Sequence, residues 1–132
     1  DDGRVISTFL SAAKRNAPLT VFGSGEQTRS FCYVTDLVDG LLSLMRVTSP
    51  ELVVVNLGND STEHSVISVA KLIRSITLGC VSTIVHLPLP ADDPCVRRPC
   101  LVRAREVLSG WSPQVSLRDG LILTMVRDQK RT

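Results

Sequence analysis

The chain has 132 residues, of which 43% are hydrophobic, and this is sufficient for one domain with a hydrophobic core. Its net charge of +2 and its scattered basic residues argue against a nucleic-acid-binding surface, which would need a basic stripe. No window approaches the roughly 18 uninterrupted apolar residues of a membrane span, so we expect no membrane contact from this segment.

The first half of the chain is predicted to form a helix, two strands and a second helix. Apolar residues recur with helical spacing from residue 3 to residue 16, and Pro18 favours an end to that helix. Strands are predicted at 19–22 and 30–34, on either side of a glycine-bearing connection. Thr35 is the expected N-cap of the next helix. The expected buried face of that helix consists of Leu37, Leu41, Leu42 and Met45.

The second half continues the alternation of strands and helices. The apolar run 52–58 is predicted to be a strand covered on both faces. Ser65 is the expected N-cap of a helix that reaches residue 76, and 82–90 is predicted to be a strand. A charged loop at 91–99 and a short helix ending near residue 108 follow, and a capping box at Ser116 and Asp119 starts the last helix. This order indicates an α/β fold whose sheet is small enough to be part of a larger unit.

The stretch VFGSGEQTRSFCYV, residues 21–34, begins with the G-x-G of a dinucleotide-binding loop. The complete fingerprint has a third glycine and a helix directly after the loop. Here Thr28 stands at the third position, and an aromatic and β-branched segment follows. We therefore interpret the stretch as a glycine-bearing connection between strands that brings Arg29 to its far end.

The four cysteines are predicted to be free thiols in a reducing compartment. Cys32, Cys80, Cys95 and Cys100 contain no C-x-x-C pair. Cys95 and Cys100, with His86 nearby, do not have the spacing of zinc ligands, and a fourth ligand is not evident. We expect no metal site.

Several separate motifs resemble one family. The relevant runs are DGRVIS-F, PLTVFGSGEQTRSFCYVTDLVDGL, VNLGN, DDP--RRP and GW-P. They are similar to the C-terminal part of the extended short-chain dehydrogenase/reductases that act on nucleotide sugars, and most of all to the UDP-glucuronate decarboxylases, or UDP-xylose synthases. The resemblance implies an α/β fold that is the C-terminal substrate-binding portion of such an enzyme, an incomplete Rossmann-type unit. Residues 1–132 would be a single nucleotide-sugar-binding portion, with the NAD-binding half absent.

The resemblance also implies a reaction for the complete enzyme. NAD oxidises UDP-glucuronate at C4, the β-keto acid loses carbon dioxide, and the reduced cofactor returns its hydride to give UDP-xylose. In that family the N-terminal half carries the NAD-binding loop and a Tyr-x-x-x-Lys pair. The sole tyrosine here, Tyr33, is followed four residues later by Leu37, so we expect this chain to hold no catalytic residue, to bind no cofactor alone and to be inactive alone.

The partners follow from the same resemblance. They are a UDP-sugar, the missing N-terminal NAD-binding half and, for the complete enzyme, a second subunit in a homodimer. We expect a cytoplasmic location, or the Golgi lumen if an upstream anchor exists.

Arg29 and Arg97 are the main candidates for substrate binding. A guanidinium group matches the geometry of phosphate and carboxylate and stays charged at any working pH. By resemblance, both arginines face the nucleotide sugar, and we expect them to converge on its diphosphate. The alternative for Arg29 is a surface ion pair with Asp36 or Glu26, and the alternative for Arg97 is a solvated charge.

Further candidates surround these arginines in the predicted site. Phe22 is expected to pack on the uracil, with a place in the core as the alternative. By resemblance, the segment with Arg4 and Ser7 approaches the nucleotide. Gln27 could add a polar contact, and Asn56 ends a predicted strand on the usual ligand side of a parallel sheet.

Two other functions remain open at this point. The first is a non-catalytic nucleotide-sugar-binding or regulatory module, because Cys95 and Cys100 stand where the family commonly has a charged residue and an aspartate. The second is a part of a related sugar-nucleotide epimerase or dehydratase, because those enzymes share much of this half.

Overall fold

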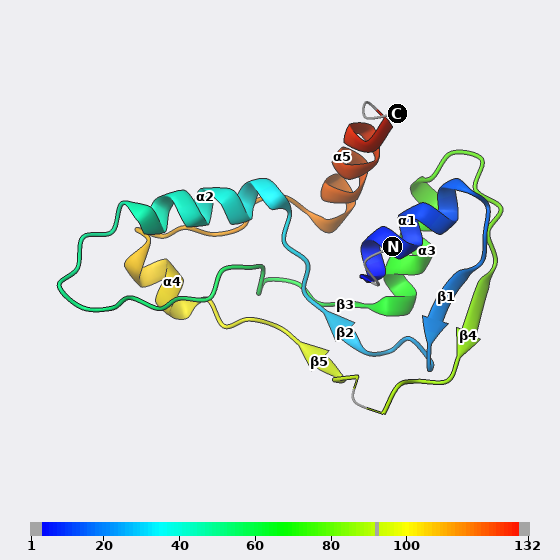
Figure 1. The fold of residues 1–132 in the computed structure, drawn as a ribbon, viewed down its shortest axis with the longest axis horizontal. Helices are drawn as coiled ribbons and strands as arrows, with labels where there is room; N and C mark the ends of the chain where they lie inside the picture. The colour runs from blue at the N-terminus through cyan, green and yellow to red at the C-terminus, as the bar shows by residue number, and fades with distance from the viewer. Residues whose placement is uncertain (1–3, 92, 130–132) are drawn as a thin grey trace. The chain divides into compact units, whose positions relative to one another are not determined.

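The computed structural model describes residues 4–91 and 93–129, and these residues have the expected α/β fold (Figure 1). The element order is α1, β1, β2, α2, β3, α3, β4, β5, α4, α5. The chain divides into two compact units. Unit 1 consists of residues 1–29, 64–96 and 121–132, and unit 2 consists of residues 30–63 and 97–120.

The centre of unit 1 is a parallel pair of strands, β1 (Leu19–Phe22) and β4 (Ile84–Leu87). Helices α1 (Val5–Lys14) and α3 (Val66–Ile76) contact β1, as Figure 1 shows. The core between them consists of Phe9, Leu10, Ala12, Ala13, Leu19, Val21, Val66, Val69, Ala70 and Ile73. The predictions for the two helices and for β1 are confirmed, and the strand predicted at 82–90 is confirmed only for residues 84–87. The strand β4 ends at Leu87, before the prolines that lack an amide donor.

A second sheet, of three strands with two residues each, starts at the glycine-bearing connection. Strand β2 (Thr28–Arg29) runs antiparallel to β3 (His64–Ser65). On its other side the amide of Thr28 donates to the carbonyl of Cys95 over 2.8 Å, next to β5 (Val96–Arg97), which was predicted to be a loop. The predicted strand at 30–34 is wrong, because the ladder ends at residue 29 and α2 already begins at residue 34.

Both predicted side-chain caps outside α2 are confirmed. Ser65 Oγ accepts the amide N–H of Ser68 over 3.3 Å at the start of α3. At the start of α5 (Leu117–Gln129), Ser116 Oγ accepts the amide N–H of Asp119 over 3.1 Å and donates to the Asp119 carboxylate. The sequence therefore determines both helix starts locally.

Helix α2 (Val34–Met45) belongs to unit 2 and starts differently from the prediction. Tyr33, not Thr35, occupies the N-cap position, and it makes no side-chain cap. Asp36 is buried, and its Oδ2 atom accepts the amide N–H groups of Gln114 and Val115 over 3.1 and 2.9 Å. This carboxylate therefore connects α2 to the 111–116 segment.

The predicted buried face of α2 is also wrong. Leu37, Leu41, Leu42 and Met45 are between 37% and 81% exposed. The inward face contains the buried residues Asp36 and Gly40, and a Cβ atom on Gly40 would be 2.9 Å from the Trp111 ring. The lack of a side chain at Gly40 lets the indole pack against the helix, so the apolar residues face outward.

The core of unit 2 forms around α4 (Val102–Val107), the predicted short helix. Buried Leu101, Ala104 and Leu108 pack with Leu44, Val47, Val55, Leu57, Val107 and Trp111. The predicted strand at 52–58 is wrong, since this segment has no regular secondary structure. A strand requires a ladder partner, and among the described residues none is recorded for this run.

None of the described helices is long and apolar enough to cross a bilayer. All four cysteines are free thiols. Within residues 4–91 and 93–129, no three His, Cys, Asp or Glu side chains gather where they could hold a metal ion.

Candidate functional site

The glycine-bearing connection between β1 and β2 is held against the start of α3. Gly25 has a φ of +81°, and a Cβ atom there would lie 2.7 Å from Val21 Cγ1 and 2.8 Å from Ile67 Cβ. Its carbonyl accepts the amide N–H of Ile67 over 3.0 Å. Only glycine fits this backbone conformation in so small a space. These contacts fix the backbone of the connection, and therefore the position from which the Arg29 side chain extends.

The Arg29 side chain is fixed as well. Its Nη2 atom lies 2.5 Å from Asp93 Oδ1, and its Nη1 atom donates to the carbonyl of Pro94 over 2.8 Å and to that of Thr28 over 2.7 Å. The side chain is only 15% exposed. The ion-pair partner is thus Asp93 and not Asp36 or Glu26, the two alternatives considered from the sequence.

Gln27 shares the same carboxylate. Its Nε2 atom donates to Asp93 Oδ2 over 3.3 Å and to the carbonyl of Phe22 over 3.0 Å. Phe22 ends β1 and is 43% exposed, so its ring is not part of the core. We call Phe22, Gln27, Arg29 and Asp93 the Arg29 cluster. Asp93 was not among the predicted site residues, although its DDP motif belonged to the family resemblance.

Arg97 and its neighbour Arg98 have different surroundings in unit 2. Arg98 Nη1 lies 3.5 Å from Glu63 Oε2. Arg97 is exposed in β5, and within the described part of the chain no partner of its guanidinium group is recorded. Of the two adjacent arginines, Arg98 has a carboxylate partner, and none is recorded for Arg97 among the described residues.

The remaining predicted residues lie on other elements. Asn56, in unit 2, donates from Nδ2 to the carbonyl of Cys100 over 3.3 Å. Arg4 occupies the N-cap position of α1, and Ser7 Oγ donates to its carbonyl over 3.0 Å. The structure thus brings Phe22, Gln27 and Arg29 together, places Arg4 and Ser7 on α1, and assigns Asn56 and Arg97 to unit 2.

In unit 2, the pKa values of the Asp60 carboxyl group and of the Cys32 thiol differ from their ordinary values. Hydrogen bonds from Arg105 to Asp60, over 3.0 and 2.5 Å, hold the pKa of that carboxyl group below its ordinary value. Burial, with a smaller contribution from the charge of Asp36, raises the pKa of the Cys32 thiol. Cys32 therefore stays a thiol at neutral pH and is poorly suited to act as a nucleophile.

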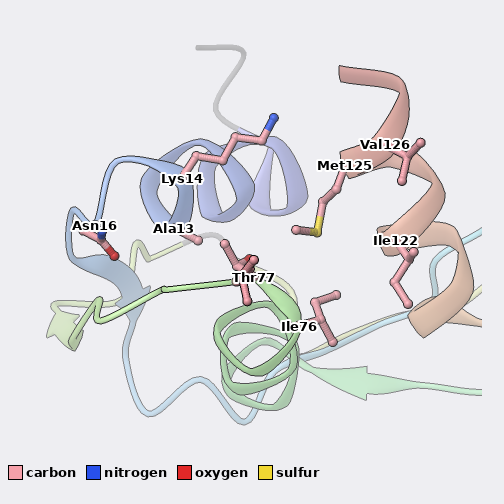
Figure 2. A pocket seen from close by; sticks show the side chains of 9 residues that line it. Ala13, Lys14, Asn16, Ile76, Thr77, Ile122, Met125 and Val126 are labelled. Atoms are coloured by element: carbon pink, nitrogen blue, oxygen red, sulfur yellow. The ribbon is translucent and has the colours of Figure 1, made fainter. Parts of the chain in front are cut away.

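A separate hollow of about 350 Å³ lies in unit 1, lined by residues of α1, α3 and α5 (Figure 2). Figure 2 shows the apolar side chains of Ile76, Ile122 and Met125 at this hollow. The lining contains one charged side chain, Lys14, and its amine forms an ion pair with Asp128. A diphosphate needs several charged donors, so this hollow is not the predicted nucleotide site.

Comparison with known sequences supports the resemblance found in the motifs. The profile of the NAD dependent epimerase/dehydratase family matches residues 1–58. The chain is 46% identical over 128 residues to UDP-glucuronic acid decarboxylase 2 of Arabidopsis thaliana. This alignment includes 97% of the chain but only 27% of the relative, so the chain spans about a quarter of that protein.

Comparison with solved structures supports the fold. An epimerase from Methanothermobacter thermautotrophicus superposes with a TM-score of 0.90 at 30% identity, over 99% of this chain and 38% of the other. A UDP-glucose 4-epimerase from Thermotoga maritima, solved with UDP-glucose, superposes with a TM-score of 0.87 at 30% identity, over 99% of this chain and 41% of the other. The similarity to UDP-glucuronate decarboxylases and the α/β fold of extended short-chain dehydrogenases, both predicted from the motifs, are confirmed.

Proposed function

We propose that this chain, similar over nearly its whole length to UDP-glucuronate decarboxylases, is the C-terminal UDP-sugar-binding part of such an NAD-dependent enzyme. The observation that carries the proposal is the Arg29 cluster, in which one carboxylate fixes two of the predicted binding side chains. A positioned guanidinium group is what binding of a diphosphate in one orientation requires.

The contacts of Arg29 leave donors for a ligand. A guanidinium group carries five N–H groups, on Nε, Nη1 and Nη2. The contacts with Thr28, Pro94 and Asp93 use both N–H groups of Nη1 and one of Nη2. The N–H on Nε and the second N–H on Nη2 remain for a phosphate oxygen. We propose that Arg97, an exposed guanidinium group, also binds the nucleotide sugar.

The other candidates receive supporting roles in this proposal. The half-exposed ring of Phe22 would pack on the uracil, and its carbonyl is already held by Gln27. Arg4, Ser7 and Asn56 would contact the nucleotide sugar from other elements.

We assign NAD and the Tyr-x-x-x-Lys chemistry to the part of the relatives that this chain does not cover, and we propose a cytoplasmic homodimer for the complete enzyme. When bound, NAD would supply hydride transfer, and this chain would hold and orient the substrate.

Isothermal titration calorimetry with UDP tests the assignment. Because a hydrogen bond to a charged group contributes about 1.5–3 kcal/mol, Arg29→Ala should weaken UDP binding by about 10-fold to 100-fold. Arg97→Ala should also weaken UDP binding. Arg98→Ala is the matched control, since Arg98 is already paired with Glu63. Equal UDP affinity in wild type and Arg29→Ala would exclude the proposed site.

Two alternatives are separated by co-expression with the NAD-binding part of a relative. An enzyme part should restore conversion of UDP-glucuronate, with release of carbon dioxide, whereas a part of an epimerase should give an epimer without that release. A non-catalytic module, suggested by Cys95 and Cys100, should bind UDP but restore neither reaction.

A further inference from the structure

The four residues that follow Arg97 are held by the loop 56–63, which belongs to the same unit. Each of the four has its own partner in the loop, and the pairs are Arg98–Glu63, Pro99–Gly58, Cys100–Asn56 and Leu101–Asp60. The contacts differ in kind, since they are an ion pair of 3.5 Å, a close packing contact and two hydrogen bonds. The loop therefore constrains the path of the backbone directly after Arg97.

Asp60 connects the loop to α4 through three hydrogen bonds. Arg105 donates from Nη1 and Nη2 over 3.0 and 2.5 Å, and the backbone of Leu101 is the third donor. The Asp60 side chain is only 12% exposed. A pair in which an arginine donates twice to one carboxylate has a defined geometry as well as a favourable energy. Asp60 therefore fixes Leu101, the N-cap position of α4, relative to the loop.

The Arg97 backbone is held on two sides. Its carbonyl accepts the amide N–H of Ser30 over 3.2 Å, and the loop 56–63 holds the residues that follow it. Arg98 precedes a proline and so favours extended backbone, in which successive side chains point to opposite sides. Because Arg98 is directed toward Glu63, Arg97 is directed to the other side. The loop thus selects which of the two arginines faces away from it.

We propose that Asp60 is a positioning residue for Arg97 in nucleotide-sugar binding. A carboxylate repels a diphosphate, so Asp60 acts through the backbone at Leu101 and not on the ligand. Without its contacts the backbone after Arg97 is less confined, and the guanidinium group must be ordered when the ligand binds. That ordering costs affinity. This inference rests on the proposed function, because it takes Arg97 to bind the nucleotide sugar.

The direction of the effect of Asp60→Asn on UDP binding tests this role. The substitution removes a negative charge from unit 2, so long-range electrostatics alone would make the UDP anion bind more tightly. A positioning role predicts the opposite, and calorimetry should show UDP binding weakened by about 5-fold. The loss should be similar in an Arg29→Ala background. In an Arg97→Ala background it should fall below about 2-fold, because a side chain that is absent cannot be misplaced.

Glu106→Gln is the matched control, since Glu106 is an exposed carboxylate of α4 and its substitution removes the same charge. It should leave UDP binding unchanged or slightly tighter. Gly58→Ala is a second test variant, because a Cβ atom there would lie 2.9 Å from Pro99 Cγ and would displace the same segment without a change of charge. Its loss of UDP affinity should depend on Arg97 in the same way, and it carries the test if Asp60→Asn does not fold.

Backbone order parameters from nuclear magnetic resonance give a second measurement that needs no ligand. In Asp60→Asn, the values at Arg98 and Cys100 should fall from about 0.85, typical of rigid backbone, to about 0.6 or below. Unchanged order parameters, unchanged or tighter UDP binding by Asp60→Asn, or an equal loss with and without Arg97 would each overturn the proposal. A wild-type chain that binds no UDP, but whose order parameters fall in Asp60→Asn, would reject only the proposed function.

Discussion

Asp93 and Arg29 are 64 positions apart in the sequence, and their side chains form an ion pair of 2.5 Å in the structure. The same carboxylate holds Gln27 through its other oxygen. Asp93 is therefore a positioning residue for the Arg29 cluster, because it orients two side chains proposed to face the nucleotide.

Asp93→Asn should weaken UDP binding several-fold. The amide cannot neutralise Arg29 or hold it as firmly, so part of the orientation is lost before the ligand arrives. The loss of stability should be about 1 kcal/mol or less, since the pair is partly exposed. Calorimetry with UDP and urea denaturation measure the two effects. Asp39→Asn, at an exposed position of α2, is the control. Tighter UDP binding by Asp93→Asn would show that the carboxylate competes with phosphate.

Gly25→Ala and Gly110→Ala should differ in their effect on stability. Both glycines have a φ of +81°, but a Cβ atom on Gly25 meets Val21 and Ile67, whereas nothing lies within 4 Å of one on Gly110. Gly110→Ala should cost about 1–2 kcal/mol of unfolding free energy for the backbone conformation alone. Gly25→Ala should cost about 1–3 kcal/mol more through overpacking. Urea denaturation measures the difference, and equal losses would contradict the packing described for the connection.

Asp36→Ala should destabilise the fold by about 1–3 kcal/mol, because it removes the buried acceptor of two backbone amides. Asp39→Ala on the same helix is exposed and should change the unfolding free energy by less than about 0.5 kcal/mol. Thermal or urea denaturation compares them. Similar small effects would mean that the amides of Gln114 and Val115 are satisfied by water.

Arg105→Ala should change the response to acid. Arg105 holds the pKa of Asp60 below its ordinary value, so the unfolded chain takes up this proton first as the pH falls. The resulting stability is complete above the ordinary aspartate pKa of about 4 and is lost as the pH falls through the lower folded pKa. In Arg105→Ala this part of the acid dependence should disappear. Unfolding midpoints measured against pH test it, with Arg103→Ala as the control. An unchanged acid dependence in Arg105→Ala would contradict the prediction.

The predictions from the sequence were most accurate for the helices whose formation depends on neighbouring residues in the chain. The helical spacing of α1 and α3, and the caps Ser65 and Ser116, depend on residues within a few positions. The orientation of α2 depends instead on Gly40 meeting Trp111, a contact between distant segments that periodicity cannot reveal. The predicted strand at 52–58 failed for a similar reason, since its hydrogen bonds depend on a neighbour that no local pattern supplies.

The candidate site could be predicted only in part. The family motif identified Arg29 and Gln27, and the structure brings them together. Their shared partner could not be found from spacing, because Asp93 lies in a loop that follows β4 much later in the chain. The contrast between Arg97 and Arg98 depends on Glu63 and likewise requires the three-dimensional structure.

The internal counter-ion on Arg29 has a consequence for the ionic-strength dependence of binding. Asp93 already neutralises Arg29 before a ligand binds beside it, so little mobile salt is displaced there. At an exposed group such as Arg97, for which no counter-ion is recorded among the described residues, dissolved ions compete directly with the ligand. Raising the salt concentration should therefore erode the contribution of Arg97 while leaving that of Arg29 largely intact.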